Sequence, residues 1–251
     1  MTGAYAVENQ FLMRLCRLAP LEAADQTAFR RLIRKSITVE ARGVVCRAGE
    51  PVEFFPAVLE GWAARCQLLS NGQRQITGLL LPGDFAYSSR HVTPFASEEI
   101  VALSACRIAL ISRRDLHDLM VERPGIANAM QVYAAVEYAI ASVWLVSLGR
   151  RNAIARLAHL LCELQHRMLQ VEQHKPNSFS LPLTQSDLAD ALGLTPVHVN
   201  RKLQRLRQDR LITLKSQSIE ILDLPFLKAS ASFDPGYLDH APAVARQHAL
   251  N

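Results

Sequence analysis

The chain has 251 residues, a length that fits one large domain or two moderate ones, each with its own core. Its hydrophobic content of 49% is that of an ordinary globular protein, which argues against a wholly disordered chain. The formal net charge is +5, and residues 150–215 hold eleven Lys/Arg against five Asp/Glu. Such a local surplus favours a polyanionic partner, above all nucleic acid, although a solvated basic helix face would give the same count.

The cysteine pattern gives no sign of a metal centre or of secretion. No Cys-x-x-Cys pair occurs, so neither a zinc knuckle nor a clustered iron–sulfur site is indicated, and we expect no metal and no cofactor. Unclustered cysteines are typical of the reducing cytosol, and the first 20 residues lack the basic-then-apolar order of a signal peptide, so we expect a cytoplasmic protein. The cysteines are Cys16, Cys46, Cys66, Cys106 and Cys162.

Amphipathic spacing over residues 21–34 predicts a short helix. Between residues 36 and 112, short β-prone runs such as ITVEARGVV and QRQITGLLL are broken by Gly, Pro and Asn. Asn71-Gly72 predicts a tight hairpin in which both residues take positive φ. Residues 101–111 are expected to form one late, largely buried strand. The spacing of these runs predicts a small barrel or jelly roll.

An apolar helix is predicted from Pro124 to Leu148. Polar residues interrupt it and leave only about 11 unbroken residues, fewer than the roughly 20 that span a bilayer, so we expect a buried helix and no membrane span. Its 3,4 spacing is typical of a coiled-coil-like seam, so we predict a homodimer, with a core helix of a monomer as the alternative. The seam residues are Ile126, Ala129, Tyr133, Val136, Ile140 and Val143.

Two short helices are predicted in residues 183–207, LTQSDLADALGLTPVHVNRKLQRLR. Thr184 can cap the first helix, and Gly193 permits a sharp turn after it. Thr195 can cap the second helix, in which Pro196 takes the first position because its missing N–H costs nothing there. A helix over residues 153–169 precedes this stretch, a loop covers residues 171–179, and two short strands are expected in residues 211–224.

The spacing within the second of these helices predicts a helix-turn-helix. Val199, Leu203 and Leu206 cluster on one side and are expected to face inward. The opposite side offers hydrogen-bond donors, a guanidinium and a small apolar group, which are suited to reading base edges and phosphates; a helical hairpin without DNA-binding function is the alternative. This exposed face consists of Val197, Arg201 and Gln204, flanked by His198, Asn200 and Arg205.

The order of these parts resembles the Crp/Fnr family of bacterial transcription regulators. Besides residues 183–207, the resemblance rests on GWAARCQLLSNGQRQITGLLLPGDF, and it covers roughly residues 20–225. It implies an α+β fold: an N-terminal jelly-roll β-barrel like that of cyclic-nucleotide-binding domains, a long dimerisation helix and a C-terminal winged helix-turn-helix. We expect these parts in residues 1–118, 119–149 and 150–225, and a tail without core contribution in residues 226–251.

The resemblance also implies partners and contacts. The family's homodimers read a palindromic site in double-stranded DNA through the major groove, and RNA polymerase is an expected partner. Arg201 matches an arginine that contacts a guanine, whereas Pro196 and Val197 replace an Arg and a Glu of cyclic-AMP-responsive members, so we expect base contacts from these three residues at a different half-site. Thr195 and His198 match phosphate-contact positions. Further phosphate or flanking contacts are expected from Thr184, Asn200, Gln204 and Arg205.

Two departures from the family concern the effector to which the regulator would respond. Ala96-Ser97 stands where cyclic-nucleotide-binding members carry Arg-Ser, and Glu98-Glu99 follows, two carboxylates that would repel a phosphate. Arg90 lies nearby at the wrong spacing. Cys16 stands alone near the N-terminus, where oxygen-sensing members hold several clustered cysteines. We therefore expect a regulator that does not depend on cyclic AMP, and its effector stays unknown.

Other functions remain open as alternatives. The chain could respond to a cyclic nucleotide. It could instead respond to redox change through Cys46, Cys66 or Cys106, or carry a haem bound by His91 or His117. A barrel enzyme of the cupin type would need a metal held by two or three His and a carboxylate, but only His91 lies between residues 36 and 112. We therefore expect that the chain is not an enzyme.

Overall fold

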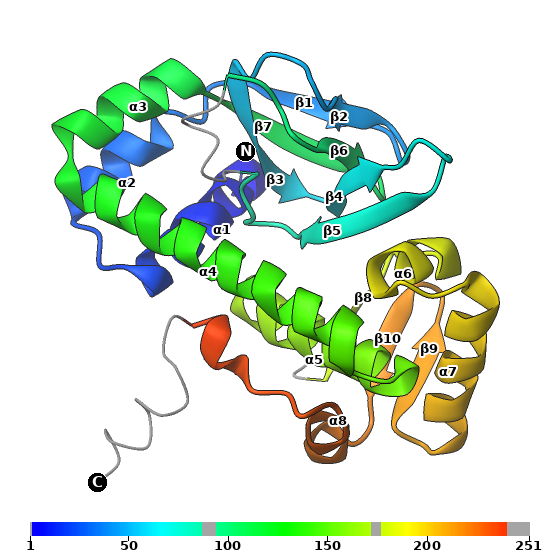
Figure 1. Ribbon diagram of the computed structural model, residues 1–251. Coiled ribbons are helices and arrows are strands. Elements are labelled where there is room, and N and C mark those ends of the chain that lie inside the picture. Colours follow the sequence, from blue (N-terminus) through cyan, green and yellow to red (C-terminus); the bar gives the residue numbers. More distant parts are fainter. Residues whose placement is uncertain (1, 87–93, 172–176, 240–251) are drawn as a thin grey trace, which may run out of the picture. The chain divides into compact units, whose positions relative to one another are not determined.

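The computed structural model describes residues 2–86, 94–171 and 177–239 (Figure 1). The chain forms two compact units. The first comprises residues 1–68 and 77–138, and the second comprises residues 69–76 and 139–251. The long helix α4 (Pro124–Arg150) contributes its first half to the first unit and its second half to the second.

Two antiparallel sheets form the barrel, as predicted. One has the strand order β1-β7-β3 and the other β2-β6-β4-β5. The expected single strand over residues 101–111 is instead two strands, because Ser104 makes a turn whose hydroxyl accepts a 3.0 Å hydrogen bond from the Trp62 backbone N–H. The strands are β1 (Ser36–Val39), β2 (Val44–Cys46), β3 (Phe54–Glu60), β4 (Ala63–Leu68), β5 (Arg74–Leu80), β6 (Glu99–Ala102) and β7 (Cys106–Ser112).

The turn between β4 and β5 differs in detail from the prediction. Gly72 has φ 83°, whereas Asn71 is not among the positive-φ residues. The Leu69 N–H donates to the Gln73 carbonyl over 2.8 Å, and the Gln73 N–H donates to Asn71 Oδ1 over 2.9 Å. The hairpin therefore closes through a three-residue loop that ends on glycine, so only this residue needs a left-handed conformation.

Aromatic side chains from distant segments fill the core of the first unit. Phe11 of α1 (Thr2–Leu18), a helix that the sequence analysis did not predict, packs 5.0 Å from the ring centroid of Phe85 and 5.2 Å from that of Phe29. Phe29 comes from α2 (Ala23–Arg30). The Tyr133 hydroxyl of α4 accepts from the Phe85 N–H and donates to the Phe85 carbonyl, each over 2.9 Å. Helix α3 (Arg113–Glu122) adds Leu116 and Leu119 to this core.

The burial of one side of α4 within the chain corrects the predicted dimer seam. Five of the six predicted residues are buried within the chain, so they do not form an exposed interface; only Val143 is half-buried and stays a prediction. The exposed side follows the same 3,4 spacing with other residues, among them Gln131, Ala135, Tyr138 and Leu145. The corrected residues are Ile126, Ala129, Tyr133, Val136 and Ile140.

By length and composition alone, α4 could cross a membrane. A buried helix of a water-soluble protein passes the same test, and Ile126, Met130 and Tyr133 lie in the core of the first unit. Burial of one side within the chain therefore accounts for part of the apolar character of this helix, of whose most apolar window 33% is buried.

The second unit contains the two short helices and a small sheet. Its strands are antiparallel in the order β8-β10-β9, and β8 lies partly where the sequence analysis expected a loop. The helix predicted over residues 153–169 is also present, and it begins at Ala153. The elements are α5 (Ala153–Val171), β8 (Ser178–Ser180), α6 (Gln185–Leu192), α7 (Pro196–Gln208), β9 (Ile212–Lys215) and β10 (Ser218–Ile221).

The predicted tail without core contribution is wrong for the residues that the structure describes. Helix α8 (Leu224–Ala231) packs against α5 (Figure 1), and a 3₁₀ turn, η2 (Pro235–Tyr237), follows it. Leu227, Phe233 and Leu238 are buried. These apolar residues are too widely spaced to give a strong periodic pattern, which is why the sequence did not reveal them.

Candidate nucleic-acid interface

The starts of α6 and α7 are fixed by side-chain caps, as predicted. Thr184 Oγ1 accepts a 3.1 Å hydrogen bond from the Asp187 N–H, and Asp187 Oδ2 accepts a 2.9 Å bond from the Thr184 N–H, which completes a capping box. Gly193 ends α6 with φ 61° and ψ 43°, the left-handed conformation that glycine tolerates. Thr195 Oγ1 then accepts from the His198 N–H over 3.3 Å, with Pro196 at the first helical position.

The inner side of α7 holds the helix in place. Val199, Leu203 and Leu206 are buried, as the helical wheel predicted. They lie on the side that packs against α6, whose Leu188 and Ala189 are buried too. This packing gives α7 a single orientation in its unit, so its outward-facing residues are defined.

The outer side of α7 is exposed and basic. Val197 is 67% exposed, and Arg201 and Arg205 are exposed as well. The helix sequence PVHVNRKLQRLRQ contains no acidic residue. The carboxylate of Asp209, which follows the end of α7, accepts a 2.8 Å hydrogen bond from Arg205 Nε, so Arg205 is held at the C-terminal end of its own helix. A cation at that end is also favoured by the helix dipole. The exposed predicted residues are Thr184, Thr195, Pro196, Val197, His198, Arg201, Gln204 and Arg205.

One predicted contact residue is less available than the others. Asn200 is half-buried, and its Nδ2 donates to Gln185 Oε1 over 3.2 Å. The pair links the first turn of α6 to the outer side of α7. Gln185 is exposed and was missed by the sequence analysis, although its place directly after the cap Thr184 is a signal for a first-turn contact.

Two further basic groups were also missed. Arg207 is exposed in the last turn of α7. Lys215 is exposed at the tip of the β9–β10 hairpin, where Ser216 and Gln217 take φ values of 46° and 62° and make a tight turn. The two strands were predicted, and a basic residue at the tip of this hairpin is a signal that could have added Lys215 to the candidate contacts.

Helix α5 supports this interface from within the second unit. Arg156 NH1 donates to the Leu192 carbonyl over 2.8 Å and so satisfies the end of α6. The buried Glu163 carboxylate accepts from Trp144 Nε1 over 2.9 Å. Burial, and after it the Arg151 charge, lower the pKa of His159 to about 4, so this imidazole is neutral at pH 7.

In the first unit, the carboxylates after Ala96 already have partners. Glu98 Oε1 accepts from Thr77 Oγ1 over 2.5 Å, and Glu99 Oε1 lies 4.0 Å from Arg47 NH1. Ala96 itself is buried. Arg90 and His91 lie outside the described residues.

A buried ionic cluster joins the barrel to the first half of α4. Glu137 accepts from Arg14 NH2 over 3.1 Å and pairs with Arg65 of β4, and Arg14 also pairs with Asp84. Burial alone would lower the pKa of Arg65, but the Glu137 charge and hydrogen bond raise it above the ordinary value. Arg65 therefore stays charged, and both arginines are held by carboxylates of the chain itself.

The remaining candidates for a sensor differ in exposure. Cys66 and Cys106 are buried, Cys46 is half-buried, and burial raises the pKa of the Cys106 thiol, which keeps it protonated at neutral pH. His117 is exposed on α3. Among the described residues, no group of three or more His, Cys, Asp and Glu could hold a metal ion.

Comparisons with known proteins agree with this architecture. Residues 155–230 match the family model of the Crp-like helix-turn-helix domain, and residues 36–123 match that of the cyclic nucleotide-binding domain. The transcriptional activator protein FnrL of Cereibacter sphaeroides is 28% identical over 218 residues, 86% of this chain and 85% of the relative. The nitrogen fixation regulation protein FixK of Bradyrhizobium diazoefficiens is 31% identical over 215 residues, 84% of this chain and 88% of the relative.

Solved structures show the same fold. The structure of FixK2 from Bradyrhizobium japonicum has a TM-score of 0.73 and 24% identity, and the match covers 80% of this chain and 98% of that one. A c-di-GMP responsive global regulator, CLP of Xanthomonas campestris, has a TM-score of 0.63 and 18% identity over 80% of this chain. The predicted fold class, with its barrel, long helix and C-terminal helix-turn-helix, is thereby confirmed.

Proposed function

Because the chain belongs to the Crp/Fnr family of DNA-binding transcription regulators, we propose that it acts as a homodimer that reads a palindromic DNA site with α7 in the major groove. The observation that carries the proposal is the two-sided character of α7. Its apolar side is buried in its own unit, and its other side presents Val197 and Arg201 to solvent.

The contacts follow from this exposed face. Arg201 is proposed to bind a guanine edge with its guanidinium, and Val197 and Pro196 to meet the apolar part of a neighbouring base. Phosphate or flanking contacts are proposed for Thr184, Thr195, His198, Gln204 and Arg205, with Gln185, Arg207 and Lys215 added from the structure. Asn200 stays a proposed flanking contact, now acting together with Gln185.

The dimer interface is proposed on the exposed side of α4. Tyr138 is 76% exposed and Leu145 is 72% exposed in the single chain, although both are large and apolar. A row of such side chains on one helix is typical of a protein–protein interface, and a second copy of the same helix would bury it. Such a dimer fits the proposed palindromic site, since a palindromic site requires a two-fold symmetric reader.

Independence of cyclic AMP is supported by the charges in the barrel. Glu98 and Glu99 would repel a phosphate, and Arg14 and Arg65 are already engaged by Glu137. A cyclic-nucleotide response and a redox response through the cysteines stay alternatives. The first is suggested by the name of the matching barrel model, whereas burial of Cys66 and Cys106 weighs against the second.

The rest of the proposal concerns the setting. We place the protein in the cytoplasm with RNA polymerase as a partner, because its relatives are named transcriptional activators. We assign it no enzymatic activity, since its family consists of transcription regulators.

A selection from random duplexes tests the proposal. The purified full chain is expected to enrich a palindrome, and sedimentation equilibrium is expected to show two chains on each selected duplex. Enrichment of a single unrepeated half-site by a monomer would contradict the dimer, and the absence of any sequence preference would contradict the assignment of α7. Addition of cyclic AMP is expected to leave the affinity unchanged.

A further inference from the structure

An amide pair joins the first residue of α6 to the outer side of α7. Asn200 Nδ2 donates to Gln185 Oε1 over 3.2 Å, and Gln185 is exposed whereas Asn200 is half-buried. The two side chains come from different helices of the second unit, 15 positions apart in the chain. The pair therefore holds the Asn200 amide in place beside the surface that the proposed function assigns to DNA.

Asn200 lies at the edge of the exposed side of α7. At roughly 100° per residue, its side chain is about 60° from that of Val197 and about 40° from that of Gln204, and both of these are exposed. The buried side chain of Leu203 lies about 60° away in the opposite sense. Asn200 thus stands between the inner and outer sides of the helix, where it can contact α6 and a base edge together.

The hydrogen bond to Gln185 leaves both amides able to bind a further partner. Asn200 Nδ2 carries two hydrogens, of which one is used, and among the described residues neither Asn200 Oδ1 nor Gln185 Nε2 has a partner. Asn200 therefore keeps one donor and one acceptor. In the major groove, adenine alone offers an acceptor beside a donor, its N7 and N6, and an asparagine amide is complementary to that pattern.

We propose that Asn200 contacts an adenine in each half-site and that Gln185 is its positioning residue, with the Gln185 N–H groups on a DNA phosphate. The inference rests on the proposed function and takes Asn200 from a flanking role to a base contact. An asparagine amide can turn over, which exchanges its donor and its acceptor. Because Gln185 accepts from Nδ2, the order of donor and acceptor is set before DNA binds, and less side-chain entropy is lost on binding.

Gln185 stands at the wall of the groove in this arrangement. An α-helix with its side chains is about 10–12 Å across and the major groove is about 12 Å wide, so residues at the edge of α7 face the phosphates. Gln185 contacts such an edge through Asn200. Its two N–H groups can bind a phosphate oxygen while its carbonyl holds Asn200, which couples the position of the DNA backbone to the contact with the base.

Competition binding of the full chain tests the pair, on duplexes that carry each of the four base pairs at every position of one half-site. Asn200→Ala is expected to lower the preference for adenine about tenfold at one position, the discrimination that a bidentate amide contact supplies. Gln185→Ala is expected to lower the same preference at least about threefold. In the double variant the loss at this position is expected to equal that of Asn200→Ala alone, because Gln185 acts on the base only through Asn200.

Gln185→Glu separates the two roles of Gln185. A carboxylate still accepts from Asn200 Nδ2, so the adenine preference is expected to stay within about twofold of that of the wild type. The carboxylate offers no donor to a phosphate and repels it, so the affinity for every duplex is expected to fall at least about tenfold. A merely structural weakening of α6 or α7 would lower the affinity for all duplexes without selecting one position.

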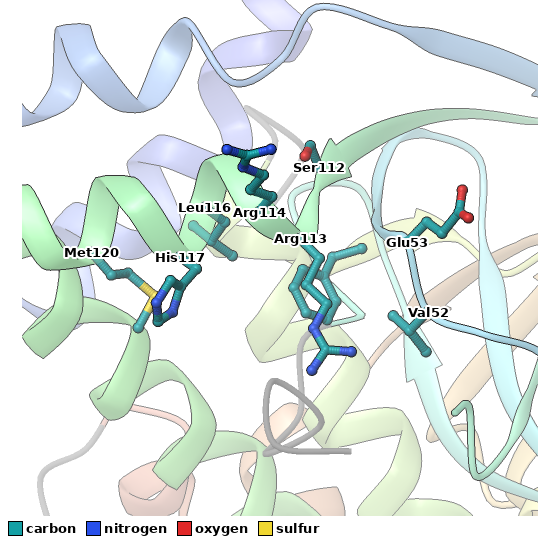
Figure 2. Close-up of a pocket in the computed structure, with 9 residues that line it drawn as sticks. Val52, Glu53, Ser112, Arg113, Arg114, Leu116, His117 and Met120 are labelled. Atoms are coloured by element: carbon teal, nitrogen blue, oxygen red, sulfur yellow. The ribbon is translucent and has the colours of Figure 1, made fainter. Parts of the chain in front are cut away.

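Two controls match these changes. Gln208→Ala removes an exposed amide from the last position of α7 and is expected to leave affinity and preference within about twofold. Arg114→Gln lowers the net charge by one, as Gln185→Glu does, but at an exposed side chain of the first unit, which holds none of the proposed DNA contacts (Figure 2). An equal loss of affinity in Arg114→Gln and Gln185→Glu would show an effect of net charge and contradict the phosphate contact.

The outcomes distinguish this inference from the function on which it rests. Adenine preference kept in Asn200→Ala or in Gln185→Ala, or lost in Gln185→Glu, would overturn the inference while the palindrome is still bound. A wild-type chain without any sequence preference would overturn the proposed function and this inference with it.

Discussion

The Tyr237 hydroxyl donates a 2.9 Å hydrogen bond to the Glu163 carboxylate, which joins the end of the described chain to the middle of α5. The same Glu163 oxygen accepts from Trp144 Nε1 of α4. Burial first, and then the Glu163 charge, raise the pKa of Tyr237 well above its ordinary value. The segment after the β9–β10 hairpin is therefore part of the second unit, and its contacts support the helix on which α6 and α7 rest.

Tyr237→Phe removes this hydrogen bond and leaves a buried carboxylate with one donor fewer. We expect the free energy of unfolding to fall by about 1–3 kcal/mol, the cost of a lost hydrogen bond to a charged group. Urea denaturation followed by circular dichroism measures the change. Glu163→Gln supplies the control background, because the charged acceptor is then already removed and Tyr237→Phe should cost less in it; an equal loss in both backgrounds would contradict the role of the Glu163 contact.

His159 gives the stability of the protein a pH dependence. Its pKa is about 4 in the folded chain and near 6.5 when unfolded, so the unfolded chain binds more protons between these values. The contribution of His159 is therefore fully present above about pH 6.5 and falls by up to about 3 kcal/mol as the pH drops towards 4. Comparison of the wild type with His159→Phe, which keeps an aromatic ring beside Phe233, isolates this residue from the other histidines. Identical pH profiles would show that His159 does not titrate in this way.

Arg201→Ala tests base reading by α7. We expect a loss of about 1–3 kcal/mol of binding energy at one base pair of each half-site and relaxed preference there, because the guanidinium is proposed to contact a base edge. Arg207→Ala serves as the comparison, since a phosphate contact weakens all sequences alike and reduces the salt slope by about 1. Competition binding on duplexes with single base changes at several salt concentrations separates the two effects. Full sequence preference in Arg201→Ala would refute the assignment.

Leu145→Glu tests the corrected dimer interface. A carboxylate on the exposed side of α4 would be buried against its copy in the partner, so we expect a monomer by sedimentation equilibrium and loss of binding to the palindrome. Val121→Glu is the matched control, because Val121 is 71% exposed on another helix, α3. Dimers of normal affinity in Leu145→Glu would move the interface elsewhere.

How far the sequence could lead depended on the kind of signal. The caps of α6 and α7, the glycine between them and the buried side of α7 were all predicted, because each depends on residues within one or two helical turns. Asn200 was placed on the correct helix, but its bond to Gln185 joins two helices and was not foreseen.

Helix α4 shows where such reasoning ends. Two sides of this helix carry apolar residues at 3,4 spacing, so the pattern predicts an interface without telling which side the barrel covers. Contacts in the first unit decide which side is covered. The Phe85 N–H donates to the Tyr133 hydroxyl, and Glu137 pairs with Arg65 of the barrel and Arg14 of α1.

By itself the sequence determined that the chain carries a barrel, a long helix and, at α7, a short helix with a basic outer side. Local spacing and helix caps are sufficient to predict these elements. Only the tertiary structure decided which residues of α4 are exposed, that residues 101–111 split into two strands, and that the segment around Tyr237 belongs to the core of the second unit. Those features depend on contacts between residues far apart in the chain, whose energies no local pattern contains.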